Sequence, residues 1–263
     1  TDMKPRRPWL NYLWNEELVC QCDQFGNGFS WMAVGTSRRD IEKGVRNVYI
    51  KDKDTGEMYC ANRNYNDLPF SVFQTHVGIN YQKIIGEYNG LSVVFTICVP
   101  TRGAVVLYDV KVVDKQNKKR NIDLYFCLQP SPALSWHDAY GYAENSEQLN
   151  GLIYYHEGFN LPDDHTRLFV GCNKKYCAYD LSHADFRGEY SGYDNPKDIK
   201  NENLSCKGAT FETEYVAAFR FADVLKESNF FEASFCSFAA KTDEEIKTLS
   251  AKYLKNSTFD EEL

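Results

Sequence analysis

The stretch Leu91–Val113, LSVVFTICVPTRGAVVLYDVKVV, contains two runs in which hydrophobic residues recur at every second position. In the first run, the alternate residues from Leu91 to Val99 share one face, because successive side chains of a strand point to opposite faces. The residues between the runs, Pro100–Gly103, have the composition of a turn. The stretch therefore predicts two consecutive antiparallel strands, the second over Val105–Val113.

The same pattern recurs along most of the chain. Further strands are predicted at Asn121–Gln129, Gly151–Gly158, Arg167–Cys172, Phe211–Phe221 and Phe230–Ala240. Many short strands with no amphipathic helices between them indicate an all-β fold, built as an antiparallel sandwich. Two long polar segments, 130–150 and 182–203, break the pattern, and loops of this length are typical of functional or disordered segments.

The character of the chain changes at Lys241. Thr242 and Glu245 have the spacing of a capping box, which predicts the start of a helix. Three hydrophobic residues then share one helical face: Ile246, Leu249 and Tyr253. We therefore divide the chain into a β-domain over residues 1–240 and the start of a helical segment over residues 241–263.

Charge and composition exclude several classes of partner. The net charge is −7, whereas a nucleic-acid partner requires a basic face. The one basic run, Lys115–Arg120, lies between two strand patterns and is interpreted as a solvent-exposed hairpin loop. No apolar run approaches the roughly 18 residues of a membrane span. The nine cysteines are an odd number, and several lie in strand patterns, which is typical of buried, reduced thiols in the cytoplasm.

The opening stretch Arg7–Trp31, RPWLNYLWNEELVCQCDQFGNGFSW, offers two motifs that bind ligands in other proteins. Gly26-Asn27-Gly28 lacks both the third glycine and the following helix of a phosphate loop, so a hairpin turn is the better interpretation. Cys20 and Cys22 are predicted to share one face of a strand, but their spacing differs from that of zinc-binding cysteine pairs. We expect no metal site.

Aromatic and histidine residues cluster later in the chain: Trp136, His137, Tyr140, Tyr142, Tyr154, Tyr155 and His156. Sugar sites combine an aromatic ring with hydrogen-bonding groups, so sugar binding is one interpretation and ordinary loop packing is the other. The substrate-binding candidates are Trp136, His137, Asp138, Tyr140, Tyr155 and His156. A two-carboxylate hydrolase is a further possibility, and its carboxylates would come from Asp138, Glu157, Asp163 and Asp164.

The opening stretch resembles the start of glycoside hydrolase family 94, the cellobiose and chitobiose phosphorylases, formerly glycosyltransferase family 36. The residues that carry the likeness are Trp9, Asn11, Tyr12, Leu13, Asn15, Glu16, Gly26, Gly28 and Ser30. The likeness continues through RNVYIKDKDTGEMY (46–59), FQTHVGINYQKIIGEYNGLSVVFTICVP (73–100) and FRGEYSGYDNPKDIKNENLS (186–205). It extends over nearly the whole chain.

The resemblance implies an N-terminal β-supersandwich, a linker helix and an (α/α)₆ barrel that carries catalysis. This chain matches the sandwich and the start of the linker, and we expect no catalytic residue in it. The complete enzyme would cleave a β-linked disaccharide or oligosaccharide by inverting phosphorolysis, with inorganic phosphate as co-substrate and no cofactor.

The resemblance also implies a homodimer in which a sandwich loop reaches the active site of the neighbouring subunit. That loop follows the strand predicted at Asn121–Gln129 and carries a Gln-Arg pair in cellobiose-type members. The corresponding segment here, SPALSWHDAYGYAENSE (131–147), contains no arginine, which argues against cellobiose specificity. We expect Trp136 and His137 to shape a different acceptor subsite. Tyr155-His156 resembles the Tyr-His pair of the family's next strand.

Three functions follow as hypotheses. The first is a non-catalytic carbohydrate-binding and dimerisation domain of a phosphorylase, in which the opening stretch forms the first hairpin. In that hairpin the tryptophans are expected to pack, and Asn11 and Asn15 to bond buried backbone groups. The second is a stand-alone carbohydrate-binding module, which predicts an exposed aromatic patch. The third, an independent hydrolase, requires a pocket with perturbed carboxylates.

Overall fold

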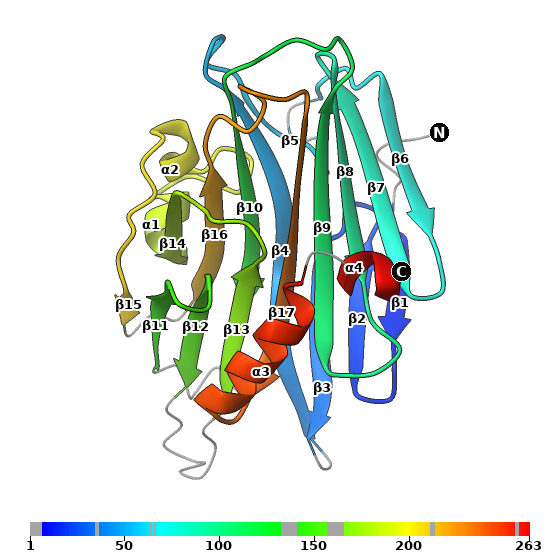
Figure 1. Ribbon diagram of the computed structural model, residues 1–263, viewed down its shortest axis with the longest axis vertical. Helices are drawn as coiled ribbons and strands as arrows, with labels where there is room; N and C mark the ends of the chain where they lie inside the picture. The colour runs from blue at the N-terminus through cyan, green and yellow to red at the C-terminus, as the bar shows by residue number, and fades with distance from the viewer. Residues whose placement is uncertain are drawn as a thin grey trace.

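The computed structural model describes residues 7–34, 37–63, 65, 67–132, 141–156, 166–210, 214–255 and 258–263, with 34, 37, 156 and 210 described by their backbone alone. Two large antiparallel sheets lie face to face, which confirms the predicted all-β sandwich (Figure 1). The chain within these ranges has no helix long and apolar enough to cross a membrane.

Sheet A has eight strands. Their order is β1 (Leu10–Trp14), β2 (Leu18–Asp23), β3 (Gly28–Val34), β4 (Ser37–Asp52), β10 (Ile122–Pro130), β16 (Tyr215–Phe221) and β14 (Ala178–Ser182), with β5 (Met58–Cys60) paired to β4. Sheet B has nine strands. Their order is β15 (Ala209–Thr210), β11 (Gly141–Ser146), β12 (Gly151–His156), β13 (Arg167–Cys172), β17 (Phe230–Ala240), β9 (Val105–Asp114), β8 (Leu91–Cys98), β7 (Tyr81–Tyr88) and β6 (Val72–Val77).

The main core lies between the two sheets and contains the alternating residues that predicted the fold. The hydrophobic side chains at alternate positions from Leu91 to Val99 are all buried there, as expected. Phe126 of β10 and Phe235 of β17 stack across the sheet interface with their ring centroids 4.0 Å apart. Burial of large aromatic side chains such as these dominates the energetics of a core.

A second hydrophobic cluster joins the outer face of sheet B to α3 (Asp243–Tyr253) and α4 (Thr258–Glu262). Ile246 and Tyr253 are buried, with Leu249 partly buried beside them, so the predicted helical stripe is covered by the chain's own sheet. The predicted cap is confirmed, since the Thr242 hydroxyl accepts a hydrogen bond from the Glu245 N–H at 3.1 Å.

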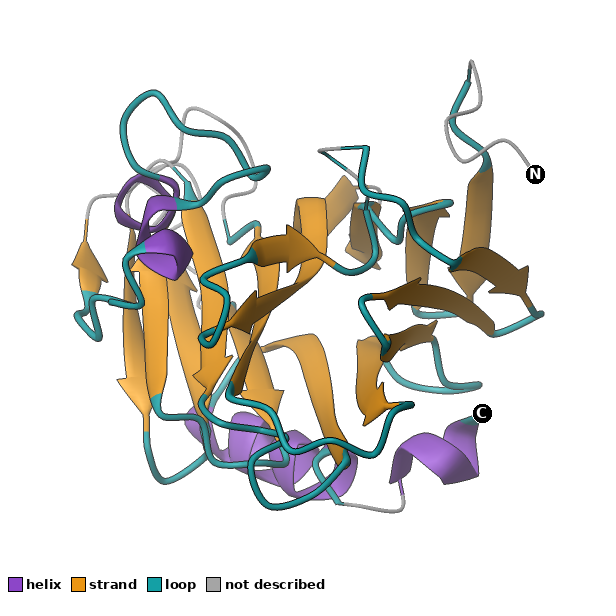
Figure 2. Cartoon of the chain, turned by 90° about the horizontal axis from the view of Figure 1, so that it is seen from above, coloured by secondary structure: helices purple, strands orange, loops and turns teal. Residues whose placement is uncertain are grey.

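A third cluster joins the outer face of sheet A to α1 (His183–Arg187) and α2 (Lys197–Lys200). Phe186 and Ile199 pack there against Tyr125 and Cys127. Figure 2 shows these helices on the opposite side of the molecule from α3 and α4. The polar segment 182–203 thus contains two short helices, and the polar segment 130–150 contains β11, although neither was expected from the sequence.

The opening stretch forms the meander β1–β2–β3, as predicted. Gly26 has a φ of 89° in the turn between β2 and β3, a left-handed conformation that favours glycine. The Asn15 side chain donates to the carbonyls of Pro100 and Gly103 at 2.8 and 2.9 Å, which confirms its expected role. The buried Asn11 Nδ2 has no hydrogen-bond partner among the described residues, so that expectation was wrong.

Two of the tryptophans also contradict the prediction. Trp9 is 75% exposed and Trp14 is 66% exposed. Trp14 lies opposite Val19 of β2, which lies opposite Trp31 of β3, so these side chains share the outer face of sheet A. Strand periodicity predicts which side chains share a face, but it does not determine whether that face is covered. Arg38 lies over the Trp31 ring, whereas Trp14 stays exposed.

The basic segment Lys115–Arg120 links β9 of sheet B to β10 of sheet A. It is therefore a connection between the sheets and not a hairpin loop. The prediction of solvent exposure holds for residues 115–119, whereas Arg120 is partly buried and its Nε lies 2.6 Å from Asp114 Oδ2.

Candidate functional site

Two of the aromatic residues that the sequence singled out form a stacked pair at the β11–β12 end of sheet B. Tyr142 lies opposite Tyr155 in the strand register, and their rings stack with centroids 4.2 Å apart and planes 12° apart. Tyr142 is exposed and Tyr155 is half-buried against α3 and the outer face of sheet B. The pair presents one flat aromatic surface of the kind that a sugar ring can cover.

Polar groups fix the inner ring of this pair. The Tyr155 hydroxyl donates to Glu144 Oε1 at 2.8 Å, and the Arg167 guanidinium lies 5.3 Å from the ring centroid. Arg167 is also paired with Asp243 of α3 at 2.5 Å. Burial, followed by the Glu144 carboxylate, raises the pKa of Tyr155, so this hydroxyl stays protonated at neutral pH. The arrangement offers hydrogen-bonding groups that can bind hydroxyl groups.

The remaining predicted site residues are only partly placed. Trp136, His137, Asp138 and Tyr140 lie outside the described residues, and so do the carboxylates Glu157, Asp163 and Asp164. His156 ends β12, and its side chain is not among those described. Tyr154, also part of the sequence cluster, is fully buried and donates to the Val216 carbonyl at 2.9 Å. It is a core residue, which corrects its place in the cluster.

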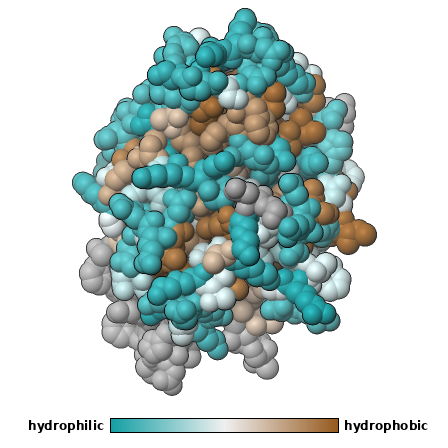
Figure 3. Space-filling view, in the orientation of Figure 1, coloured by the Kyte–Doolittle hydropathy of each residue, from teal (hydrophilic) through white to brown (hydrophobic). Residues whose placement is uncertain are grey.

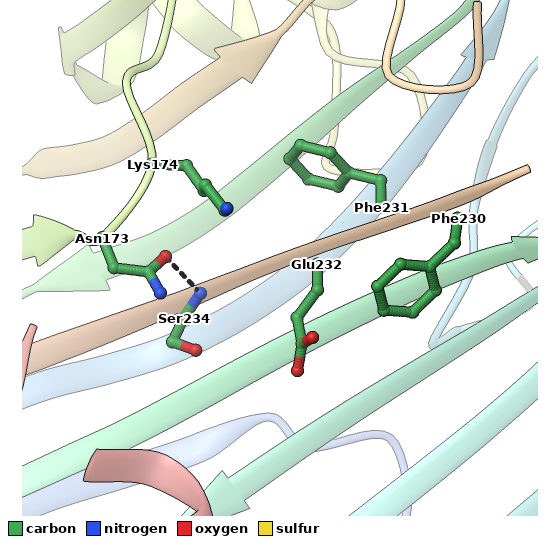
Figure 4. Close-up of a pocket in the computed structure, with 6 residues that line it drawn as sticks. All are labelled: Asn173, Lys174, Phe230, Phe231, Glu232 and Ser234. Atoms are coloured by element: carbon green, nitrogen blue, oxygen red, sulfur yellow. Dashed lines mark hydrogen bonds between the residues drawn. The ribbon is translucent and has the colours of Figure 1, made fainter. Parts of the chain in front are cut away.

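A groove of about 420 Å³ opens elsewhere on the outer face of sheet B (Figure 4). Residues from β17 and from the segment after β13 line it: Asn173, Lys174, Phe230, Phe231, Glu232 and Ser234. The Asn173 side-chain oxygen accepts a hydrogen bond from the Ser234 N–H at 2.9 Å, which ties the two sides together. On the upper part of this face, hydrophobic surface adjoins hydrophilic surface (Figure 3).

A buried carboxylate lies behind the groove. Asp109 of β9 is 1% exposed, and its Oδ1 accepts a hydrogen bond from the Ser234 hydroxyl at 2.9 Å. Lys111 Nζ lies 2.8 Å from Glu232 Oε1 and 3.7 Å from Asp109 Oδ2. Burial raises the pKa of Asp109 to about 6, an effect that the Ser234 hydrogen bond and Lys111 oppose.

The sequence reasoning missed this groove, although one signal for it was present. In FFEASFCSFAA (230–240), Phe230, Glu232 and Ser234 occupy alternate positions, so they share a face that is more polar than the rest of the strand. Asn173 and Lys174 come from a distant part of the chain. Only the pairing of β13 with β17 brings the two segments together.

A second group of ionisable residues is sealed inside the sandwich. Arg46 and Glu42 are fully buried and paired at 2.9 Å, and Tyr108 also donates to Glu42. Cys20 and Cys22 lie beside them with their sulfur atoms 3.7 Å apart. The parts of the chain that are described contain no group of three or more residues able to hold a metal ion. Full burial indicates a structural role for this cluster.

Solved structures of similar fold are large carbohydrate-active proteins and smaller epimerase-like proteins. A bacterial glucoamylase complexed with acarbose matches with a TM-score of 0.57 at 9% identity, over 95% of this chain and 36% of the other. A putative kojibiose phosphorylase from the human microbiome matches with a TM-score of 0.54 at 11% identity, over 94% of this chain and 33% of the other. A GalM/aldose epimerase homologue from C. elegans matches with a TM-score of 0.52 at 9% identity, over 90% of this chain and 100% of the other. At these identities the likeness shows the fold alone.

Similar sequences belong to phosphorylases. Cellobionic acid phosphorylase from Neurospora crassa is 27% identical over 229 residues, which are 82% of this chain and 28% of that protein. Solabiose phosphorylase from Paenibacillus borealis is 22% identical over 213 residues, 76% of this chain and 28% of that protein. The chain thus spans little more than a quarter of these relatives. The family model described as "Glycosyl hydrolase 94, supersandwich domain" matches residues 1–256, and the chain belongs to that family.

Proposed function

We propose that this chain is the non-catalytic N-terminal domain of a disaccharide or oligosaccharide phosphorylase, with roles in carbohydrate binding and dimerisation. The family match over residues 1–256 carries the proposal, together with relatives that are phosphorylases and are several times longer. The described part of the sandwich adds support, because its tyrosine stack offers an aromatic surface for binding. The nine free cysteines fit a protein of the reducing cytoplasm.

In this proposal residues 1–240 form the supersandwich, and residues 241–263 begin a linker to an (α/α)₆ catalytic barrel. The barrel would supply an acid that protonates the glycosidic oxygen. Inorganic phosphate would attack the anomeric carbon with inversion, so that the glycosidic C–O bond breaks as the new C–O bond to phosphate forms. No organic cofactor is required.

The sandwich would contribute to the acceptor side of that reaction. We assign this role to the loop residues Trp136, His137, Asp138 and Tyr140, together with Tyr155 and His156 of β12. In a homodimer of the complete enzyme this loop would reach the neighbouring active site. Tyr142 and Tyr155 lie close to its base, because β11 begins at Gly141, directly after the loop. The natural substrate would be a β-linked disaccharide or oligosaccharide.

The first test is a phosphorolysis assay. The 263-residue chain is incubated with inorganic phosphate and a panel of β-linked glucosyl and N-acetylglucosaminyl disaccharides, and sugar 1-phosphate is measured. A complete cellobionic acid phosphorylase serves as the positive control. We expect no product from the chain alone. Clear turnover would overturn the accessory-domain assignment and direct attention to Asp138, Glu157, Asp163 and Asp164.

A stand-alone carbohydrate-binding module is the second candidate, and the exposed aromatic side chains at the N-terminal end of sheet A favour it. Trp9, Tyr12, Trp14 and Phe29 are all exposed, and the Tyr12 hydroxyl accepts a hydrogen bond from Gln21 at 2.7 Å. This function predicts sugar affinity that Trp14→Ala removes and Tyr142→Ala does not. The opposite pattern would assign binding to the tyrosine stack, with exposed Tyr190→Ala as the control.

A further inference from the structure

The groove on sheet B is separate from the tyrosine stack and has its own set of binding groups. Along β13, Arg167 lies beside the stack, whereas Asn173 at the groove follows six residues later, about 20 Å of extended strand. A ligand in the groove would therefore occupy a different site from one on Tyr142 and Tyr155.

Charges of both signs surround the groove. Lys174 lines it, and Lys111 lies at its base in an ion pair with Glu232. Asp109 lies behind Ser234 as the second carboxylate. An anion such as phosphate would meet Glu232, with the buried Asp109 behind it, and a cation would meet Lys174, with Lys111 beside Glu232. A neutral ligand with many hydroxyl groups avoids both conflicts and can use donors and acceptors together.

An aromatic ring lies next to these polar groups. Phe230 is 44% exposed, and it shares one face of β17 with Glu232 and Ser234. Figure 4 shows Phe230 and Glu232 extending from one side of β17 and Phe231 from the other, with Lys174 and Asn173 on the adjoining segment. An exposed ring beside a carboxylate, an ammonium and an amide is the combination that a sugar ring requires, because its C–H face and its hydroxyl edge need different partners.

The groove also has the features of a preformed ligand site. It is concave, hydrogen bonds fix Asn173 and Ser234, an ion pair with Lys111 holds Glu232, and a perturbed carboxylate lies behind it. We propose that this groove is a second saccharide site, which binds one ring of a neutral oligosaccharide over Phe230 with its hydroxyl groups on Glu232 and Lys174. This role rests on the proposed phosphorylase function: the site would hold a longer substrate at a distance from the place of cleavage.

The test is a ligand-detected NMR titration of the 263-residue chain with the β-1,4-linked tetrasaccharide of glucose. Phe230→Ala and Glu232→Gln are expected to weaken binding at least tenfold each. Lys175→Ala is the matched control, because Lys175 is exposed next to Lys174 and does not line the groove. It should leave the affinity unchanged. Glu232→Gln keeps the side-chain shape, so it remains informative should the aromatic variant be unstable.

Three outcomes would overturn the proposal. They are no binding of the tetrasaccharide up to its solubility limit, binding that survives both groove substitutions, and displacement of the sugar by inorganic phosphate in a manner that depends on Lys174. The last result would identify an anion site. These outcomes are independent of the phosphorolysis assay, so failure of the groove and failure of the accessory-domain assignment are distinguishable.

Discussion

The outer faces of the two sheets differ in what covers them. On sheet B, α3 and α4 bury Ile246, Tyr253 and Phe259 against the strands. On sheet A, α1 and α2 cover the end around β10, β14 and β16, whereas Trp14 on β1 is exposed. Strand periodicity is equally regular in both places. A strand pattern therefore identifies a hydrophobic face, while burial depends on which other segment packs on it.

The largest expected effect comes from the covered face of sheet B. Ile246→Ala should lower the free energy of unfolding by about 2–5 kcal/mol, because it leaves a cavity between α3 and the sheet. Urea denaturation measures the change, and Thr248→Ala, at an exposed position of the same helix, is the control. Equal values for the two variants would contradict the view that α3 is firmly packed.

The pH should affect the free energy of unfolding through the covered part of sheet A. Asp180 and Asp198 are both buried between β14 and α2, and burial raises the pKa of Asp180 to about 8. Because this folded-state pKa exceeds the unfolded value, the contribution of Asp180 to stability is complete below about pH 4 and is lost as pH rises towards 8. Between pH 6 and 7 the wild type should lose up to about 1.4 kcal/mol relative to Asp180→Asn.

Unfolding free energies at the two pH values measure this difference. Asp194→Asn, an exposed carboxylate in the same segment, should keep the wild-type slope. Identical slopes for wild type and Asp180→Asn would show that the buried carboxyl group does not govern the docking of α2.

Stability should depend moderately on the N-cap of α3, the helix that covers sheet B. Thr242→Ala removes the hydroxyl that accepts from the Glu245 N–H and should cost about 1 kcal/mol. Thr242→Ser, which keeps the acceptor, should restore most of this loss. The comparison is made by thermal or urea unfolding, and a serine variant as unstable as the alanine variant would argue against capping as the cause.

The smallest effect is expected on the open face. Trp14→Ala should change stability by no more than about 0.5 kcal/mol, since exposed side chains away from special features contribute little. Urea denaturation measures the change in the free energy of unfolding for this variant too. A loss comparable to that of Ile246→Ala would mean that another part of the molecule covers Trp14.

Much of the fold was predictable because local patterns determine it. The strands over Leu91–Val113 and Phe230–Ala240 have regular alternation, and the cap at Thr242 has a specific spacing. The β11 strand escaped notice because GYAENS is short and contains mostly small and polar residues. The helices α1 and α2 were missed because four or five residues are too few to establish a helical period.

The candidate sites were predictable only where their residues are close in sequence. Tyr155 belongs to an aromatic stack, and its partner Tyr142 lies thirteen residues away across one hairpin. The groove combines β17 with the segment after β13, so it depends on tertiary pairing that no local pattern encodes. The buried pair Arg46–Glu42 was missed for a related reason, since charged residues in a strand normally indicate a solvent-facing side.

The open face of sheet A has a spectroscopic consequence. The chain has four tryptophans, of which Trp9 and Trp14 are exposed, Trp31 is partly exposed, and Trp136 lies outside the described residues. The three described indoles lie on or beside β1–β3, so their fluorescence reports on this surface and not on the core. Their emission should already resemble that of indole in water and change little on denaturation. A ligand or a partner domain that covers β1–β3 should shift the emission to shorter wavelength.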